Sequence, residues 1–425
     1  MNILYLRFLH PTKVQLVILI AIILLGLSLN LSAYSGSSLA LAGSYSLRAS
    51  GSEANYWNPA NFAYPSTYDT EIMLINSYIS LNNNALSIGK YNDYNGTYLT
   101  DKDKQDIVNS LQNRLLVNSS FSHYLLGFSF NRFAISSKIN LFAQGNLSAK
   151  YVELLLLGNE YDRSYSFGKD KNNLEALGYI DFTIGFSPYS FILIDYLIHT
   201  GIALSYLTGL GVLTTEDYEG ILNVSDDGVQ LEQNITMKNG LSGYGFKSMI
   251  GFRSDINENL SIGLSIDNLA GFINWTSNTE RRYYSASIDS LYIIDLDEDI
   301  FDHSEIKEEI GHFKTYLPVF TRISVLYRLE NVDLSLDWKQ GYVNSVLTSK
   351  TPEISMGTEY YLTPYIPLRM GFRPGLGAEP YNLTYGLGFE TKSFEFNLGI
   401  NSIGALIPST YSKGIAVAIS SKWRF

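Results

Sequence analysis

Residues Asn382–Asn401 read NLTYGLGFETKSFEFNLGIN, and apolar and polar side chains alternate along both halves of this stretch. The apolar positions are bulky: Leu383, Tyr385, Leu387 and Phe389, then Phe394, Phe396, Leu398 and Ile400. The positions between them carry Asn, Thr, Gly and Glu. A period of two residues is typical of a β-strand with two different faces. The short Thr391–Ser393 segment predicts a hairpin that joins two strands, each long enough to cross a membrane.

The same alternation recurs upstream, with one exception at Leu326. The apolar faces are Val332, Leu334, Leu336 and Trp338; Ile323, Val325, Tyr327 and Leu329; Ile262, Leu264 and Ile266; and Phe182, Ile184 and Phe186. A soluble sandwich also alternates, but here the polar faces are rich in Gly, Ser, Thr and Asn with charges of both signs. That composition suits a narrow wet lumen. The pattern predicts an all-β protein, a transmembrane antiparallel barrel of the bacterial outer membrane. The lipid bilayer of that membrane is then an expected partner.

The carboxyl end carries a second signal. Ile415, Val417, Ile419, Trp423 and Phe425 share one face of a final strand. A last strand that ends in an aromatic residue is the feature that the barrel-assembly machinery reads in many outer-membrane barrels. We therefore expect Trp423 and Phe425 to form a terminal assembly signal.

Composition narrows the function classes. The 425 residues include 32 Tyr, 22 Phe and 34 Gly but no Cys, and the formal net charge is −11. The mean hydropathy of +0.01 excludes a bundle of membrane helices. Without cysteine there is no disulfide, thiolate metal site, cysteine nucleophile or lipid-bearing cysteine. Without a block of Lys or Arg, nucleic acid is not an expected partner. On composition alone, a large soluble β-protein remains an alternative interpretation.

The amino terminus has the features of a targeting segment. Arg7 and Lys13 precede an apolar run over Val14–Leu31, and small residues follow it. A basic start, an apolar middle and a small-residue exit predict a secretory signal peptide over residues 1–35, cleaved after Ser35. Cleavage after Ala33 and an uncleaved inner-membrane anchor are the alternatives.

The mature chain, residues 36–425, is predicted to be one domain. Two segments within it change to a helical period: Asp101–Leu116, with Thr100 or Asp101 as the N-cap, and Ser148–Leu157. We expect both to be loop or plug helices. The acidic stretch Asp289–Glu309 is predicted to be a loop outside the membrane.

A family resemblance rests on Leu39–Ala63, which reads LALAGSYSLRASGSEANYWNPANFA. This stretch resembles the amino terminus of FadL-like and PorV-like outer-membrane proteins, in which such a segment leads to a WNPA motif, here Trp57, Asn58, Pro59 and Ala60. The resemblance implies a barrel of about 14 strands whose amino-terminal segment, residues 36–66, folds into the lumen as a hatch. The residues themselves also fit a fixed turn into the first strand, because Pro59 excludes Asn58 from the α region.

Further resemblance covers most of the mature chain. It is to a related family of uncharacterised bacterial outer-membrane proteins, and it rests on Leu99–Gln105, Glu153–Glu160, Phe313–Pro318 and Pro367–Gly371. The resemblance implies a fold and a location and brings no activity with it.

Signals for chemistry are few. His303 and His312 have a spacing that suits no common metal motif. Asp295, Asp297 and Asp299 resemble a calcium loop, but Ile300 stands where an EF-hand needs glycine. No Gly-x-Ser-x-Gly, phosphate-loop or His-Glu-x-x-His pattern occurs. The sequence therefore predicts no catalytic residues, no metal and no cofactor, and the chain is not expected to be an enzyme, with a barrel lipase or protease as the alternative.

The predicted lumen faces carry charges of both signs. They are Arg322, Arg328, Asp333, Asp337, Lys339, Glu359, Arg369, Arg373, Glu390 and Glu395. Such charges either pair with one another in a filled interior or steer a permeating solute. The leading functional hypothesis is passive transport or binding of small, hydrophobic molecules. The alternative is a PorV-like, non-transporting accessory barrel that binds exported or partner proteins through acidic loops. A soluble or anchored β-protein is the third.

Overall fold

The computed structural model describes residues 35–425 except 65–68, 112, 227, 292–301 and 375–380. Of the predicted signal peptide, residues 1–34 therefore lie outside the described residues. Within the described residues fourteen strands form a closed ring. In ring order they are β1 (Thr70–Asn83), β2 (Arg114–Phe130), β3 (Phe133–Ser148), β5 (Asn173–Phe186), β7 (Tyr196–Ser225), β8 (Gly228–Asp255), β9 (Leu260–Leu291), β12 (Phe320–Arg328), β13 (Val332–Gly341), β14 (Glu353–Thr363), β15 (Ile366–Pro374), β16 (Tyr381–Glu390), β17 (Phe394–Ile403) and β18 (Gly414–Arg424).

Every neighbouring pair in this ring is antiparallel, and β18 returns to pair with β1. Tyr78 on β1 lies opposite Ala418 on β18 in this closing pair. The hairpin predicted from Asn382–Asn401 is present as β16 and β17, with Gly386 opposite Gly399. The predicted fold class, an antiparallel barrel of about 14 strands, is confirmed.

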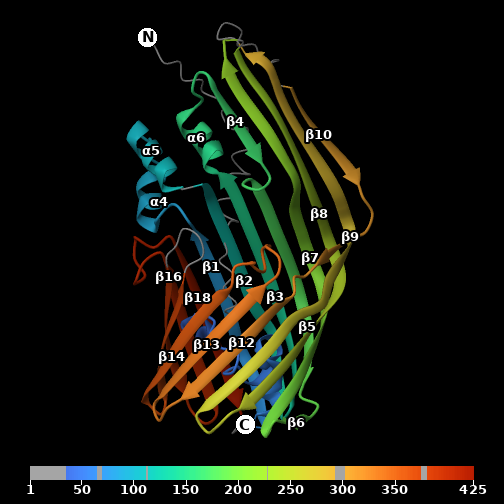
Figure 1. The fold of residues 1–425 in the computed structure, drawn as a ribbon, viewed down its shortest axis with the longest axis vertical. Coiled ribbons are helices and arrows are strands. Elements are labelled where there is room, and N and C mark those ends of the chain that lie inside the picture. The colour runs from blue at the N-terminus through green and yellow to red at the C-terminus, as the bar shows by residue number, and fades with distance from the viewer. Residues whose placement is uncertain (1–34, 65–68, 112, 227, 292–301, 375–380) are drawn as a thin grey trace.

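The strands differ greatly in height. β7, β8 and β9 have 30, 28 and 32 residues, whereas a membrane crossing takes about 9–11. Beyond the rim they are flanked by β4 (Arg163–Gly168), which pairs with β7, and β10 (Asp302–Glu309), which pairs with β9. The upper parts of β7, β8 and β9 form a tall sheet with β4 and β10 at the upper end of the molecule in Figure 1, and we call this sheet the blade. Short turns and the carboxyl terminus lie at the lower end.

Two short strands complete the sheet. β11 (Phe313–Tyr316) pairs with β9 between the barrel and the blade. β6 (Ser190–Leu193) forms a hairpin with the start of β7 at the lower end.

The acidic stretch Asp289–Glu309 is not a single loop as predicted. Its first residues end β9, its last eight form β10, and only 292–301 fall outside the described residues. β9 offers arginines beside the acidic side chains, with Arg281 near Glu308 and Arg282 near Glu305. The continuous ladder with β9 holds this acidic segment as a strand, and the arginines offset part of its charge.

Helices α4 (Ile88–Tyr94), α5 (Asp101–Ser110) and α6 (Ala149–Leu157) lie at the upper end (Figure 1). α6 matches the prediction, and the Ser148 hydroxyl caps it by accepting from the Tyr151 amide. α5 ends sooner than predicted because Arg114–Leu116 pair with β3 as the start of β2. No helix among the described residues is long and apolar enough to cross a membrane.

The start of α5 is a capping box between Thr100 and Asp103. The Thr100 hydroxyl donates to the Asp103 carboxylate over 2.6 Å, and the Thr100 amide donates to it over 2.9 Å. These two hydrogen bonds hold the pKa of Asp103 below its ordinary value.

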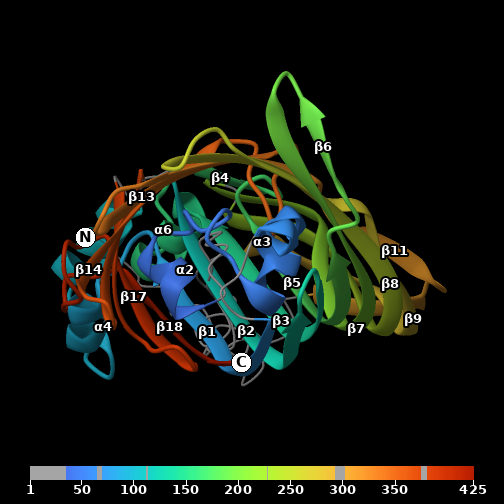
Figure 2. The same ribbon diagram turned by 90° about the horizontal axis from the view of Figure 1, so that it is seen from below.

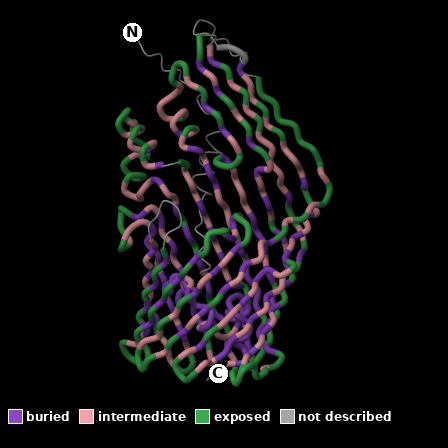
Figure 3. The backbone as a smooth tube through the Cα atoms, viewed as in Figure 1, coloured by how far each residue is buried: buried purple, intermediate pink, exposed green. Residues whose placement is uncertain are grey.

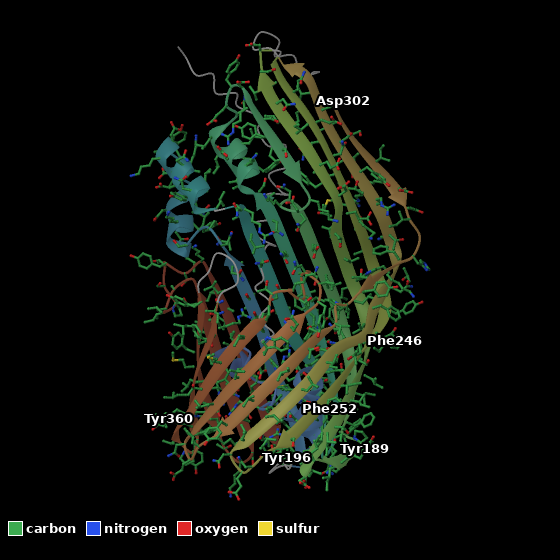
Figure 4. All side chains as sticks on the ribbon, in the orientation of Figure 1. Tyr189, Tyr196, Phe246, Phe252, Asp302 and Tyr360 are labelled. Atoms are coloured by element: carbon green, nitrogen blue, oxygen red, sulfur yellow. The ribbon has the colours of Figure 1, made fainter. Side chains whose placement is uncertain are left out.

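The outer surface of the barrel is apolar. On β12, Ile323 and Tyr327 are exposed while Ser324 between them is buried, and the same parity continues around the ring. Figure 4 shows Tyr360 and Tyr196 near the lower rim and Phe246 higher on the wall. Exposed aromatic rings at two heights around an apolar band are the pattern of a membrane-embedded barrel.

We expect an arginine on the outer face at mid-height to be costly. Leu398→Arg on β17 should lower the free energy of unfolding in lipid vesicles by about 2–4 kcal/mol, because a charge would face hydrocarbon. Leu155→Arg, on α6 above the rim, is the matched control and should change it by less than about 0.5 kcal/mol. Equal costs in urea titrations of the two variants would contradict the placement of the bilayer.

Candidate functional site

The lower half of the lumen is filled by the amino-terminal segment. Residues 35–64 form α2 (Gly36–Ala40) and α3 (Ala54–Trp57) with the 3₁₀ turns η1 (Gly51–Glu53) and η2 (Pro59–Ala63). Figure 2 shows α2 and α3 inside the ring of strands, and Figure 3 shows buried residues concentrated at this end. Residues 52–63 are all buried. We call residues 35–64 the plug.

The plug begins with a capped helix. Ser35, after which we predict signal cleavage, is the first described residue and the N-cap of α2, where it forms a capping box with Ser38. Cleavage after Ala33, the alternative, would retain this cap.

The Asn58-Pro59 pair connects the plug to the wall. Asn58 is extended, with φ −159° and ψ 106°, as a residue before proline prefers. Its Oδ1 accepts from the Ala60 amide over 3.0 Å, which starts η2, and its Nδ2 donates to the Phe252 carbonyl on β8 over 3.0 Å. The motif is therefore both a fixed turn and a contact between plug and barrel.

Trp57 is enclosed between the plug and β12. Its ring meets Tyr45 edge-on with centroids 5.4 Å apart. The Arg322 guanidinium lies 4.8 Å from the Trp57 ring and donates to the Trp57 carbonyl over 3.2 Å. A cation over an indole face, combined with a hydrogen bond, fixes this side chain against the wall.

Glycines in the wall make room for the plug backbone. A Cβ atom at Gly201 on β7 would lie 2.0 Å from the carbonyl carbon of Pro59, and one at Gly251 on β8 would lie 2.0 Å from Asn58 Oδ1. On the far side, a Cβ at Gly399 would lie 2.3 Å from the carbonyl oxygen of the first residue of α2. These separations admit only glycine, so the lumen face is shaped to the plug.

Buried ion pairs join the plug to the strands. Arg48 pairs with Asp333 over 2.5 Å and with Glu359, and Glu359 also binds Arg369, which reaches Glu390 over 2.6 Å. Glu359 and Arg369 are almost fully enclosed. A single plug arginine thus holds strands β13, β14 and β15 together at one point.

A second ionic group lies beside the seam of the barrel. Lys422 on β18 pairs with Glu53 of the plug over 2.5 Å and with Glu71 on β1 over 3.5 Å. Arg424 pairs with Glu71 over 3.3 Å and also binds Glu395. The plug therefore contacts the strand pair that closes the ring.

The predicted lumen charges lie on the inner side of the wall and divide among several contacts. Asp333, Glu359, Arg369 and Glu390 gather around Arg48; Lys339 and Arg373 both pair with Glu353; Asp337 accepts from Ser46; Arg328 lies over the Tyr64 ring; Glu395 binds Arg424; and Arg322 contacts Trp57. In this conformation these charged side chains pair with one another and with the plug.

Sequence reasoning did not identify the partners Arg48, Glu53, Glu71, Lys422 and Arg424. The available signal was that the hatch-like segment carries an arginine and a glutamate, which need counter-charges once they are inside a barrel. The predicted assembly signal lies at the lower rim, where Trp423 and Phe425 are exposed and stacked with ring centroids 6.3 Å apart.

Above the plug the lumen wall becomes apolar. Asp181 on β5 still accepts a hydrogen bond from plug Tyr56 over 2.5 Å, but the next inward positions toward the upper end carry apolar side chains. The apolar lumen cluster consists of Leu177, Tyr179, Leu207, Val212, Ile273, Trp275, Leu317 and Val346. This cluster was not predicted, because the inner faces were expected to be polar throughout.

Two residues of this cluster come from segments outside the long strands. Leu317 follows β11, where Thr315 accepts from the Trp275 indole over 2.9 Å, and Val346 belongs to the β13–β14 connection. The Val346 amide donates to the Glu175 carboxylate over 3.2 Å. A cavity of about 80 Å³ remains between them.

Among the described residues no group of three or more His, Asp and Glu side chains is placed to hold an ion. His303 lies on β10 and His312 follows it, while Asp295, Asp297 and Asp299 lie outside the described residues.

The fold and lumen define a transmembrane β-barrel closed by an internal plug. A family of unknown function (DUF5723) matches this chain over residues 59–401, and the chain belongs to that family. No curated protein matches it.

Solved structures with a similar fold include the toluene transporter TodX of P. putida and the toluene transporter TbuX of Ralstonia pickettii. Each is 12% identical, with 93% of this chain and 99% of the other covered, at a TM-score of 0.49. A Pseudomonas aeruginosa FadL homologue is 11% identical over 92% and 98% of the two chains, at a TM-score of 0.48.

We expect a side chain at Gly201 to displace the plug. Gly201→Val would drive Cβ into the Pro59 backbone, so single-channel conductance in planar bilayers should rise, as it should for Trp57→Ala with Asn58→Ala. Gly145→Ala is the control, because its Cβ would be 3.8 Å from the nearest atom. A Gly201→Val barrel that folds and stays as silent as wild type would contradict a plug held by close packing.

Proposed function

We propose that the protein is an outer-membrane barrel that binds small hydrophobic molecules and gives them passage, with the plug closing the lower lumen. The observation that carries this is the apolar lumen cluster directly above a polar, ion-paired plug. Inner walls of wet barrels are ordinarily polar. An apolar wall at this one level favours an apolar solute, because burying apolar surface gains about 25 cal/mol per Å².

The burial of the cluster supports a binding role. Ile273 and Trp275 are buried together with Leu317 and Val346, so these apolar side chains are not exposed to water in this conformation. The β13–β14 connection that carries Val346 is attached to the wall through the Glu175 hydrogen bond. A solute that displaced this connection would meet Leu177, Val212 and the rest of the cluster.

The orientation follows from the two ends of the barrel. Outer-membrane barrels have short periplasmic turns and long extracellular loops. The plug end is therefore periplasmic, and the blade and helices α4–α6 are extracellular. The resemblance of Leu39–Ala63 to FadL-like proteins agrees with such a role. A cleaved signal peptide, assembly through Trp423 and Phe425, and the absence of catalysis remain predictions.

The accessory-barrel alternative differs in what it needs. A barrel that only binds exported or partner proteins has no use for an apolar lumen cluster, whereas it does need an extracellular surface that another chain can hold. Loss of uptake with retained partner binding, or the reverse, separates the two functions.

We expect the apolar cluster to control uptake of apolar solutes. Leu207→Ser with Ile273→Ser should slow uptake of N-phenylnaphthylamine by expressing Gram-negative cells about tenfold or more, because each lost side chain is worth about 1.5–3 kcal/mol of burial. Leu204→Ser, on the lipid face of the same strand, is the control. Equal uptake by the double variant, confirmed as folded by its heat-modifiable gel band, would overturn the proposed function.

A further inference from the structure

The two outer edges of the blade differ in how far other parts of the described chain cover them. At one edge, β4 has Tyr165 and Phe167 buried, and α6 lies against it with Tyr151 and Phe167 in edge-on contact at 5.1 Å. An ion pair between Arg163 and Glu153 adds to this cover. At the other edge all eight residues of β10 are exposed. Figure 1 shows β10 along the outer margin of the blade, away from the helices.

The ladder between β10 and β9 is regular. It runs through eight consecutive pairs, from Asp302 opposite Ser287 to Glu309 opposite Glu280, without a bulge. The next amide, that of Ile310, donates to the Thr279 carbonyl over 3.1 Å in the same register. Hydrogen-bonded and non-bonded pairs alternate in an antiparallel ladder, so the even-numbered residues of β10 bond to β9.

The odd-numbered residues of β10 therefore direct their N–H and C=O groups away from β9. These residues are His303, Glu305, Lys307 and Glu309. Within the part of the chain that the structure describes, no strand pairs with this side. A straight edge of this length is a template for another strand.

The charge of the edge restricts what can add to it. β10 has four carboxylates, at Asp302, Glu305, Glu308 and Glu309, against the single lysine Lys307. The nearest arginines reach Glu308 and Glu305 only at 3.8 Å, and no described ion pair involves Asp302 or Glu309. A second copy of β10 would place like charges together, whereas a segment rich in Lys or Arg would be attracted.

An exposed apolar side chain lies at the centre of the acidic edge. Ile306 is 60% exposed and lies opposite Tyr283, which is also exposed. An added strand would place a side chain over this pair, on the face that also carries Ser304 and Glu308. Figure 4 shows Asp302 near the top of the blade, far from the lower rim.

We propose that the outward edge of β10 binds an extended, basic segment of another extracellular protein as an added β-strand. Main-chain hydrogen bonds would come from Glu305, Lys307 and Glu309, and specificity from the carboxylates and Ile306. This interaction goes beyond the proposed passage of solutes and does not depend on it. The acidic side chains exclude copies of this chain while they admit a basic partner.

The test uses the full mature chain in nanodiscs and a fluorescein-labelled nonapeptide in which lysine alternates with threonine and valine. Binding is followed by fluorescence anisotropy. We compare Lys307→Pro with Lys307→Ala, since both remove one positive charge but only proline removes an outward N–H group. Proline is tolerated at such a position of an edge strand, because no bond to β9 is lost.

Lys307→Ala should bind the peptide as tightly as wild type or more tightly, and Lys307→Pro should bind it about tenfold more weakly or worse. Glu305→Pro is the second variant if Lys307→Pro does not fold, and a peptide with alternate backbone nitrogens methylated should fail against wild type. Glu305→Gln with Glu309→Gln should weaken binding and reduce its salt dependence.

Three outcomes would overturn the proposal. The first is no binding of the peptide to wild type, and the second is equal binding by the proline and alanine variants, which would leave charge attraction alone. The third is a wild-type dimer that Lys307→Pro dissolves, because the occupant would then be a second copy. None of these outcomes bears on uptake through the lumen, so the proposed function stands or falls separately.

Discussion

The pairing of β18 with β1 is the constraint on which the rest of the structure depends. In hydrocarbon every backbone N–H and C=O must find a partner within the protein, and only a closed sheet provides this for strands. Once the ring is closed, the period of two sends one set of side chains to lipid and the other to an enclosed space. Leu398 and Leu387 face outward at the same level where Gly399 and Gly386 face inward.

The polar lumen cannot be filled by packing apolar side chains together. The plug fills it instead through close contacts at glycines and through ion pairs. Removing charges from water is costly, so buried ion pairs need not stabilise the fold. The pairs of Arg48 with Glu359 and of Lys422 with Glu53 are therefore weak evidence that the plug adds to the stability of the barrel. They are better evidence for position, since each fixes a plug residue against one place on the wall. Lys422 and Glu53 do so beside the β1–β18 seam, which links the plug to ring closure.

The sequence predicted the short strands best, and the reason is physical. Strands such as β13 and β16 are about as long as the membrane is thick and are bounded by turn residues, so their alternation begins and ends with the strand. In β7–β9 the alternation continues past the bilayer, and nothing in one strand marks where lipid ends. β10 was not predicted for the same reason, because the pairing of Glu308 with Arg281 depends on a residue 27 positions earlier in the sequence.

In the lumen, the alternation of a strand predicts which side chains face inward, but not how deep along the barrel axis each one lies. Parity alone placed Arg322 and Asp337 on the inner face. Their partners Trp57 and Ser46 depend on how deep the plug reaches, which no local pattern records. The helix predicted over Asp101–Leu116 failed at its end for a related reason. Leu115 fits the helical period, but its pairing with Leu147 on β3 decides its conformation.

β9 shows how one strand serves both the barrel and the blade. Its outer partner is β12 over residues 260–267, β11 over 272–275 and β10 over 280–287. Asn268, Ala270 and Asn278 have positive φ values and lie between these regions, so the strand is irregular where its partner changes. The ring is complete below the first of these breaks. The blade is therefore not required for closure, and its stability comes from its own ladder and from the contact with α6. The barrel closes without the blade, whose β4 edge is covered by α6 while no described strand pairs with its β10 edge, so the blade can serve a separate purpose outside the membrane.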